Sequence, residues 1–248
     1  MKNLQPQGLW SNFYDLTQIP RPSGQKEEVS AFLANYGRSL GLETIVDAIG
    51  NVIIRKPASP GYENHPGVIL QGHMDMVPQK NNDTQFDFAK DPIEAYIDGE
   101  WVTAKGTTLG ADNGIGVAAA MAILADKSVV HPPLEVLITV DEETGMFGAD
   151  GIDLSQLQGR TLINIDSEEE GIFTVSCAGG ATATLNLNVE RRAVYGPCIR
   201  LAVDGLQGGH SGVEIHKNRA NANKIMGEFM SRIQKLMPLC LTSFSGGS

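Results

Sequence analysis

The chain has 248 residues, 42% of them hydrophobic, which is enough for one large domain or two small ones with a packed core. Asp and Glu number 29 against 19 Lys and Arg, so the formal net charge is -10. This acidic balance argues against a nucleic-acid backbone or an anionic membrane as partner. The N-terminus has no apolar segment typical of a signal peptide, and no apolar run approaches the length of a membrane span.

The cysteine content argues against a disulfide framework. Cys177, Cys198 and Cys240 are an odd number and show no CxxC spacing. We therefore expect reduced, buried thiols in a cytoplasmic protein, and neither a disulfide scaffold nor a thiolate zinc site.

The first hundred residues carry signals for two helices and several strands. Apolar residues at helical spacing predict a first helix that ends before Pro20. The turn Arg21–Gly24 follows, and its Ser23 is a candidate N-cap for the second helix, which ends at Gly41. The predicted elements are helices around 9–16 and 29–40, strands at 44–46 and 51–55, and a hairpin over 93–102 that turns at Asp98–Gly99.

Three apolar runs have the composition of buried strands, and each is followed by acids or a histidine. Buried strands that alternate with helices indicate an α/β fold with a mostly parallel sheet flanked by helices. Ligand sites in such sheets lie beyond the carboxyl ends of the strands. The runs are 68–70, followed by His73 and Asp75; 133–140, followed by Glu142 and Glu143; and 161–165, followed by Asp166.

His73 and Asp75 are two residues apart at the end of the first run. Residues i and i+2 of a strand point to the same face, so the carboxylate can lie behind the imidazole, fix its tautomer and raise its basicity. The alternative is an ordinary surface turn that contains a His and an Asp. The acids at the ends of the other two strands favour a site.

A glycine-rich segment, 105–116, precedes an apolar helix over 117–124. Glycines let the backbone approach a ligand closely at a helix entrance. A phosphate cradle is the first alternative, but the GxxxxGK[ST] pattern is absent. The central side chain is Asp112, which would repel a phosphate and can bind a cation.

The sequence changes character after Gly180. Alternating polar and apolar residues predict half-exposed strands over 181–189 and 199–203, and an amphipathic helix follows around 225–236. We therefore expect a larger domain over 1–188 and the beginning of a smaller α+β domain over 189–248.

The residues at the strand ends form a candidate ligand set of one imidazole and several carboxylates. This set suits zinc, with cobalt or manganese as alternatives. Converging carboxylates repel one another unless cations lie between them, and a pair of divalent ions can share a hydroxide that attacks a polarised carbonyl. In the pair Glu142–Glu143, one acid can bind metal while its neighbour takes the proton. The alternative is that these acids are solvated loop residues.

Longer blocks of the sequence resemble the bacterial aminoacyl-histidine dipeptidases (peptidase D), which belong to the carnosinase and carboxypeptidase G-like zinc metallopeptidases. The short HxD and EE motifs mark the broad family, whereas the blocks at 74–83 and 105–114 are more specific to the dipeptidases. The blocks that carry the resemblance are 71–83, 105–114, 141–146, 164–171 and 208–212.

The resemblance implies a dipeptidase that hydrolyses Xaa-His dipeptides such as β-alanyl-histidine through a metal-bridged hydroxide. It implies a small dipeptide as substrate and two divalent metal ions. It also implies that residues 1–188 are the catalytic domain, without its C-terminal part, and that residues 189–248 begin a lid domain through which a homodimer forms. The implied roles are His73, Glu143 and Asp166 as ligands; Asp112 as the bridging ligand, with a cis peptide bond to Asn113; Asp75 as the residue that orients His73; Glu142 as the general base; and His210 as the residue that stabilises the oxyanion.

The sequence departs from this family in length. Its members are nearly twice as long, and a second histidine ligand near their C-terminus has no counterpart here. The expectation is therefore a fragment or a truncated product. The alternatives are a related N-acyl amino acid amidohydrolase, against which the dipeptidase-specific blocks argue, and a metal-binding remnant without activity.

Overall fold

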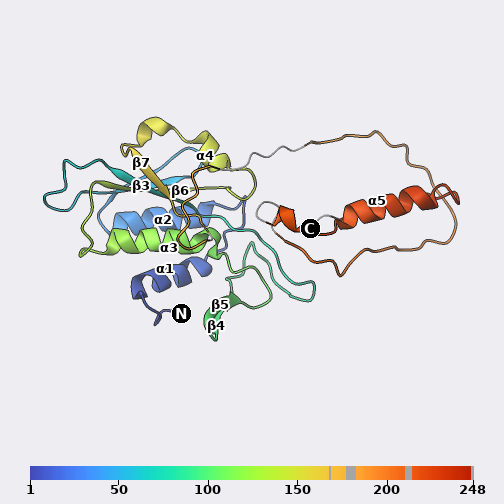
Figure 1. The fold of residues 1–248 in the computed structure, drawn as a ribbon, viewed down its shortest axis with the longest axis horizontal. Coiled ribbons are helices and arrows are strands. Elements are labelled where there is room, and N and C mark those ends of the chain that lie inside the picture. The colour runs from blue at the N-terminus through green and yellow to red at the C-terminus, as the bar shows by residue number, and fades with distance from the viewer. Residues whose placement is uncertain (168, 177–182, 210–213, 247–248) are drawn as a thin grey trace. The chain divides into compact units, whose positions relative to one another are not determined.

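The computed structural model describes residues 1–167, 169–176, 183–209 and 214–246. The chain divides into two compact units, Met1–Ile172 and Phe173–Ser248 (Figure 1). The predicted domain boundary at residue 189 lies inside the second unit and stays a prediction. No helix among the described residues is both long enough and apolar enough to cross a membrane.

The first unit contains the elements that the sequence predicts there: two N-terminal helices, the two strands that follow them, the hairpin, and the helix that begins at the glycine-rich segment. A short helix, α4, and a 3-10 turn, η1, are additional. The helices are α1 (Gln7–Thr17), α2 (Glu27–Ser39), α3 (Ala111–Ala125) and α4 (Phe147–Gly151), with η1 at Leu154–Gln156; the strands are β1 (Glu43–Val46), β2 (Val52–Lys56), β3 (Val68–His73), β4 (Ala95–Asp98), β5 (Trp101–Ala104), β6 (Leu134–Thr139) and β7 (Thr161–Asn164).

The main sheet has the strand order β1-β2-β6-β3-β7. Strand β3 lies between β6 and β7 and runs parallel to both, whereas β2 pairs with β6 and with β1 in antiparallel fashion. The predicted α/β class is confirmed. Because β6, β3 and β7 are parallel neighbours, their carboxyl ends meet at one edge of the sheet, where the sequence places its acids and its histidine.

The larger core lies on one face of the sheet, where α1, α2 and α3 are stacked (Figure 1). Phe13 of α1, Leu33 of α2 and Met121 of α3 pack there with Ile138 of β6, and all four are essentially inaccessible to solvent. A smaller cluster on the other face joins Ile53, Ile69 and Leu137 to the segment around η1. The site edge is therefore supported by a packed core on both sides of the sheet.

Strand β7 is confirmed as a strand, but the prediction that it is buried is wrong. Leu162 and Ile163 are 51% and 44% exposed. Among the described residues β7 is an edge strand that pairs with β3, so one of its sides has no neighbouring strand to cover it.

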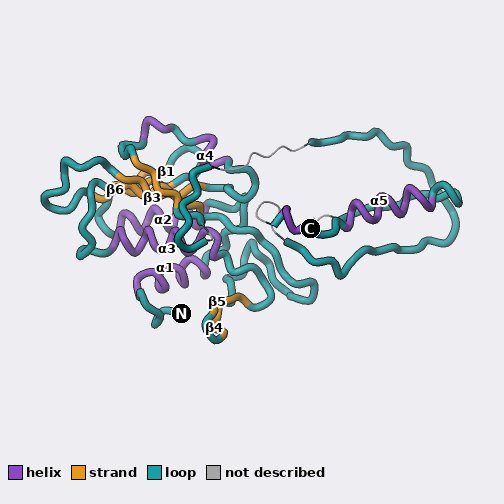
Figure 2. The backbone as a smooth tube through the Cα atoms, viewed as in Figure 1, coloured by secondary structure: helices purple, strands orange, loops and turns teal. Residues whose placement is uncertain are grey.

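The second unit contains η2 (Ile215–Lys217) and α5 (Ala222–Ile233) among its described residues, and α5 confirms the predicted amphipathic helix. The predicted strands are wrong for the described residues 183–189 and 199–203, which form no strand (Figure 2). Leu185 and Leu187 are each 81% exposed. A half-buried strand needs a paired neighbour and a covered apolar face, and these residues have neither.

The cysteines also differ from expectation where the structure describes them. Cys198 and Cys240 are free thiols, as predicted, but they are exposed and not buried. Both lie in the second unit. Cys177 lies outside the described residues.

Candidate metal centre

His73 is the last residue of β3 and is buried at the carboxyl end of the sheet. Its Nδ1 lies 3.1 Å from the backbone oxygen of Asp75 and 3.4 Å from the Asp75 carboxylate. A carbonyl oxygen can only accept a hydrogen bond, so Nδ1 carries the hydrogen and Nε2 faces the site. In the neutral imidazole, Nε2 therefore offers its lone pair to a metal ion.

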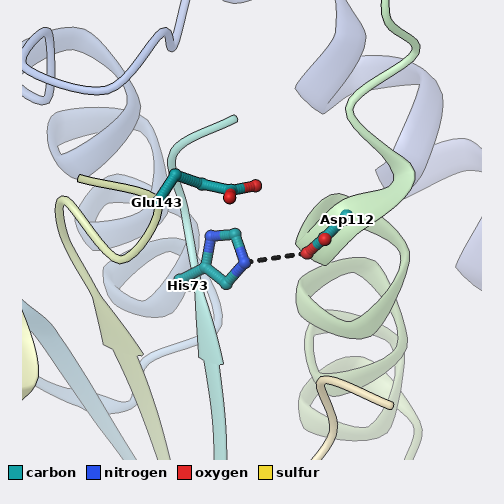
Figure 3. Close-up of side chains that lie close together, drawn as sticks. All are labelled: His73, Asp112 and Glu143. Carbon is teal, nitrogen blue, oxygen red and sulfur yellow. Dashed lines mark hydrogen bonds and ion pairs between the residues drawn. The ribbon is translucent and has the colours of Figure 1, made fainter. Parts of the chain in front are cut away.

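Asp112 approaches Nε2 of His73 from the entrance of α3 (Figure 3). Its Oδ1 lies 2.9 Å from His73 Nε2. Gly110 precedes the helix with φ 72°, and Asp112 itself has non-helical backbone angles, so the chain turns sharply where the carboxylate is presented. The peptide bond between Asp112 and Asn113 is cis, as the resemblance implied.

The other acids come from the loops after β6 and β7. Ligand atoms of His73, Asp112 and Glu143 all lie within 4.8 Å of one another, and so do those of His73, Glu142 and Asp166. Figure 3 shows Glu143 and Asp112 on two sides of the His73 ring. The structure thus brings the five residues that the sequence placed at strand ends and at the helix entrance into two groups that share His73.

The ionisation of these side chains reflects their crowding. Burial opposes the charged imidazolium, but hydrogen bonds to Asp112 and Asp75 outweigh it and raise the pKa of His73 to about 10. Burial, together with the charge of Asp112, raises the pKa of Glu143 to about 7. Burial is also the main cause that raises the pKa of Asp166 to about 6. Carboxylates that repel one another are stabilised by a cation placed between them.

The residues present fit a divalent metal ion. Each group offers one imidazole nitrogen and two carboxylate oxygens, a borderline-hard set that suits zinc, cobalt or manganese, and no thiolate belongs to either group. Both groups use the same nitrogen of His73, and one lone pair binds one ion, so the imidazole can serve one ion while the four carboxylates supply the remaining donors.

Asp75 lies behind His73, as the sequence predicted, and it makes contacts that the sequence did not reveal. Its carboxylate accepts hydrogen bonds from the backbone N–H groups of Glu142 at 3.0 Å and Glu143 at 3.3 Å, and from the Ser23 hydroxyl at 2.7 Å. Burial alone would raise the pKa of Asp75, but hydrogen bonds, first that of His73, lower it to about 2. Asp75 is therefore a fixed anion.

The sequence did not predict the contacts that Ser23 and Asn113 make near the site. Ser23 is not the N-cap of α2, which begins at Glu27 after Lys26, because its hydroxyl is used by Asp75. The Asn113 side chain accepts a hydrogen bond from the backbone N–H of His73 at 3.3 Å and donates one to the Ile165 carbonyl at 3.0 Å. It therefore connects the ends of β3 and β7. Neither residue type signals a metal site in a sequence.

Among the described residues, His65, His131 and His216 belong to neither group. His210, the predicted oxyanion residue, lies outside the described residues. The buried His131 contacts the Pro132 carbonyl through Nδ1 at 2.7 Å, and His65 stacks on Tyr62. His65 is exposed, and His216 lies in the turn η2.

The chain is similar in sequence to known proteins. The chain is 50% identical to the cytosol non-specific dipeptidase of Escherichia coli over 250 residues, which cover 100% of this chain and 52% of that protein. It therefore spans about half the length of this curated relative. It is 27% identical over 172 residues to the protein YqjE of Bacillus subtilis, covering 64% of this chain and 43% of that protein.

Solved structures of dipeptidases and aminopeptidases also superpose on the chain. The aminoacylhistidine dipeptidase of Vibrio alginolyticus superposes with a TM-score of 0.69 at 42% identity, covering 95% of this chain and 48% of that chain. An aminopeptidase PepT of Bacillus cereus superposes with a TM-score of 0.56 at 26% identity, over 67% of this chain and 44% of that one. Residues 69–210, which include every residue of the two ligand groups, match the family described as Peptidase family M20/M25/M40. The chain belongs to this peptidase family.

Proposed function

We propose that the protein is a metal-dependent dipeptidase whose centre is formed by His73, Asp112, Glu142, Glu143 and Asp166. The observation that carries the proposal is the pair of ligand groups that share His73 at the carboxyl edge of the sheet. The family membership and the names of the relatives support hydrolysis of a peptide bond.

Two divalent ions, zinc with cobalt or manganese as alternatives, are proposed for these groups. His73, Asp112, Glu143 and Asp166 would hold them, with Asp112 between the two ions. Ions bound there would polarise the scissile carbonyl and lower the pKa of a water molecule.

The proton transfers are assigned to Glu142. Its side chain is partly exposed and its Oε2 lies 3.9 Å from His73 Nε2, so it lines the site and is open to an incoming substrate. We propose that Glu142 accepts a proton from the attacking water and delivers it to the leaving amine. Asp75 keeps His73 in the tautomer that presents Nε2 to the site, and His210 is proposed to stabilise the oxyanion.

The proposed substrates are dipeptides that include Xaa-His sequences such as β-alanyl-histidine. The names of two relatives differ on this point, since one is a non-specific dipeptidase and the other an aminoacylhistidine dipeptidase. A cytoplasmic location follows the name of the Escherichia coli relative. Residues 189–248 are proposed to begin a lid domain through which the protein dimerises.

A pair of matched variants tests the mechanism. The chain is assayed against β-alanyl-histidine and against dipeptides without histidine, with zinc, cobalt or manganese added. Glu142→Gln should lower kcat by at least about a hundredfold, the lower end of general-base contributions, while metal content is retained. Glu143→Gln should lower metal content as well as rate.

Three other results would contradict the proposed base, activity or substrate class. Normal turnover by Glu142→Gln would show that Glu142 is not the base. Metal binding without turnover by the unaltered chain would favour the inactive remnant. Hydrolysis of N-acyl amino acids in preference to every dipeptide would favour the amidohydrolase alternative.

A further inference from the structure

The turn Arg21–Gly24, between α1 and α2, is attached to the loop that follows His73. Pro22 and Met76 form a parallel bridge, the Met76 N–H donates to the Arg21 carbonyl at 3.1 Å, and the Ser23 N–H donates to the Met76 carbonyl at 3.3 Å. These backbone bonds fix the register between the turn and the end of β3. No candidate ligand belongs to this turn.

Arg21 joins two segments of the site. Its side chain is fully buried, with 2% relative exposure. Nη1 donates to the carbonyls of Met74 at 2.9 Å and Asp75 at 3.3 Å, and Nη2 donates to the carbonyl of Gly110. One rigid guanidinium therefore holds the loop after His73 against the entrance of α3, two residues before Asp112.

The surroundings of Arg21 are shaped to contain it. A Cβ atom at Gly110 or at Gly114 would lie 2.5 Å from Arg21 Nη2. Each glycine therefore leaves the space that the guanidinium occupies. At Gly110 a Cβ atom would also lie 2.7 Å from Met76 Sδ, and the positive φ there favours glycine as well.

Ser23 and Gly24 connect the turn to the other acids. The Ser23 hydroxyl donates to Asp75 Oδ2, and the same carboxylate receives the N–H groups of Glu142 and Glu143. The Gly24 N–H donates to Asp141 Oδ1 at 2.7 Å. Because Asp141 directly precedes the Glu142–Glu143 pair, the turn holds the loop after β6 at two points.

We propose that the turn Arg21–Gly24 is the positioning element of the metal centre. Arg21 sets the separation of His73 and Asp112, and Ser23 fixes Asp75 between His73 and the Glu142–Glu143 pair. Neither residue touches metal or substrate. The inference rests on the proposed metal centre and adds the residues that give it its geometry.

The first test uses Ser23 and cobalt, whose visible absorption reports coordination geometry. Ser23→Ala in the 248-residue chain should weaken Co²⁺ binding about tenfold and change the absorption bands, because residues that hydrogen-bond to the ligand-orienting groups affect metal affinity by this order of magnitude. Ser23→Thr keeps the hydroxyl and should restore both. The control is Ser30→Ala on α2, which removes a hydroxyl bonded to the Gly50 carbonyl at 2.9 Å, and it should leave both unchanged.

The second test separates positioning from stability. Arg21→Lys keeps a positive charge but loses the planar fork, and it should weaken Co²⁺ binding at least about tenfold. Arg55→Lys is the control, because Arg55 forms ion pairs with Glu43 and Glu135 away from the site. Both variants are expected to lower the melting temperature of the metal-free chain, but Arg55→Lys should keep the affinity and the spectrum.

The outcomes distinguish this inference from the proposed function. If the unaltered chain does not bind Co²⁺, the metal centre and its positioning element are both wrong. If the unaltered chain binds Co²⁺, and Ser23→Ala and Arg21→Lys bind it with the same affinity and spectrum while folded, the metal centre stands and the positioning role is wrong.

Discussion

His73 is the residue on which the candidate centre depends, because both ligand groups contain it. Its position at the end of β3 is fixed by its pairing with Thr139 of β6 and by the Asn113 side chain, which accepts from its backbone N–H, and its ring is fixed by Asp75. Each carboxylate, by contrast, belongs to one group. Loss of the imidazole removes the nitrogen donor of both groups and should therefore weaken metal binding strongly.

We expect His73→Ala to reduce Co²⁺ affinity by more than the roughly 10–100-fold that is typical for residues that only orient a ligand. The matched control is His131→Ala. His131 is also a buried histidine, but it belongs to neither ligand group, and its Nδ1 contacts the Pro132 carbonyl. His131→Ala should retain the affinity. The measurement is titration of each folded variant with Co²⁺ followed by visible absorption. Equal affinities in the two variants would contradict the assignment of His73.

The sequence was sufficient to predict which chemical groups meet, but not what holds them. His73 and Asp166 follow from residue type and from the rule that parallel strands end at one edge, and Asp112 follows from its place in a glycine-rich helix entrance. Ser23 and Arg21 are separated by 52 or more positions from the residues that they contact. Serine and arginine in a Pro-Gly turn have ordinary local explanations, so only tertiary structure reveals their contacts.

At the scale of elements, α2 packs closely against β1 and β2 of the sheet. Gly37 of α2 faces β1 and β2, and a Cβ atom there would lie 2.5 Å from Thr44 Oγ1 and 3.0 Å from Ile54 Cδ1. The helix therefore packs closer to the sheet than any larger residue would permit. Gly8 of α1 is different, since a Cβ atom there would lie 3.6 Å from the Cβ of Ala122, an ordinary contact.

Gly37→Ala should therefore destabilise the protein by about 1–3 kcal/mol, the usual cost of overpacking, although alanine favours helices. Gly8→Ala lies at an exposed helical position and should be neutral or stabilise by up to about 1 kcal/mol. Urea unfolding midpoints of the metal-free variants check both. A stabilising Gly37→Ala would mean that α2 can move away from β1 and β2 at little cost.

The elements also show where a sequence pattern is insufficient. Period-2 alternation at 183–189 predicts a strand, but a strand forms only where a neighbour supplies backbone partners, and the described residues there have none. The apolar content of β7 predicted burial, whereas its place at the edge of the described sheet leaves it exposed. Continuous apolar runs such as β6, which has neighbours on both sides, were predicted correctly.

At the scale of the whole molecule, the functions proposed for the chain are divided between its two units. All residues of the two ligand groups, and the turn Arg21–Gly24, belong to Met1–Ile172. His210 and the proposed lid belong to Phe173–Ser248. Metal binding should therefore depend on the first unit alone, and turnover on both.

A chain shortened to Met1–Ile172 tests this division. We expect it to bind Co²⁺ with the affinity and spectrum of the 248-residue chain, because every described ligand is present, and to hydrolyse no dipeptide, because the proposed oxyanion residue is absent. The control is His73→Ala in the shortened chain, which should remove binding. Circular dichroism establishes that each chain is folded. If the folded shortened chain loses its affinity for Co²⁺, residues of the second unit contribute ligands, and the centre is larger than the two groups around His73.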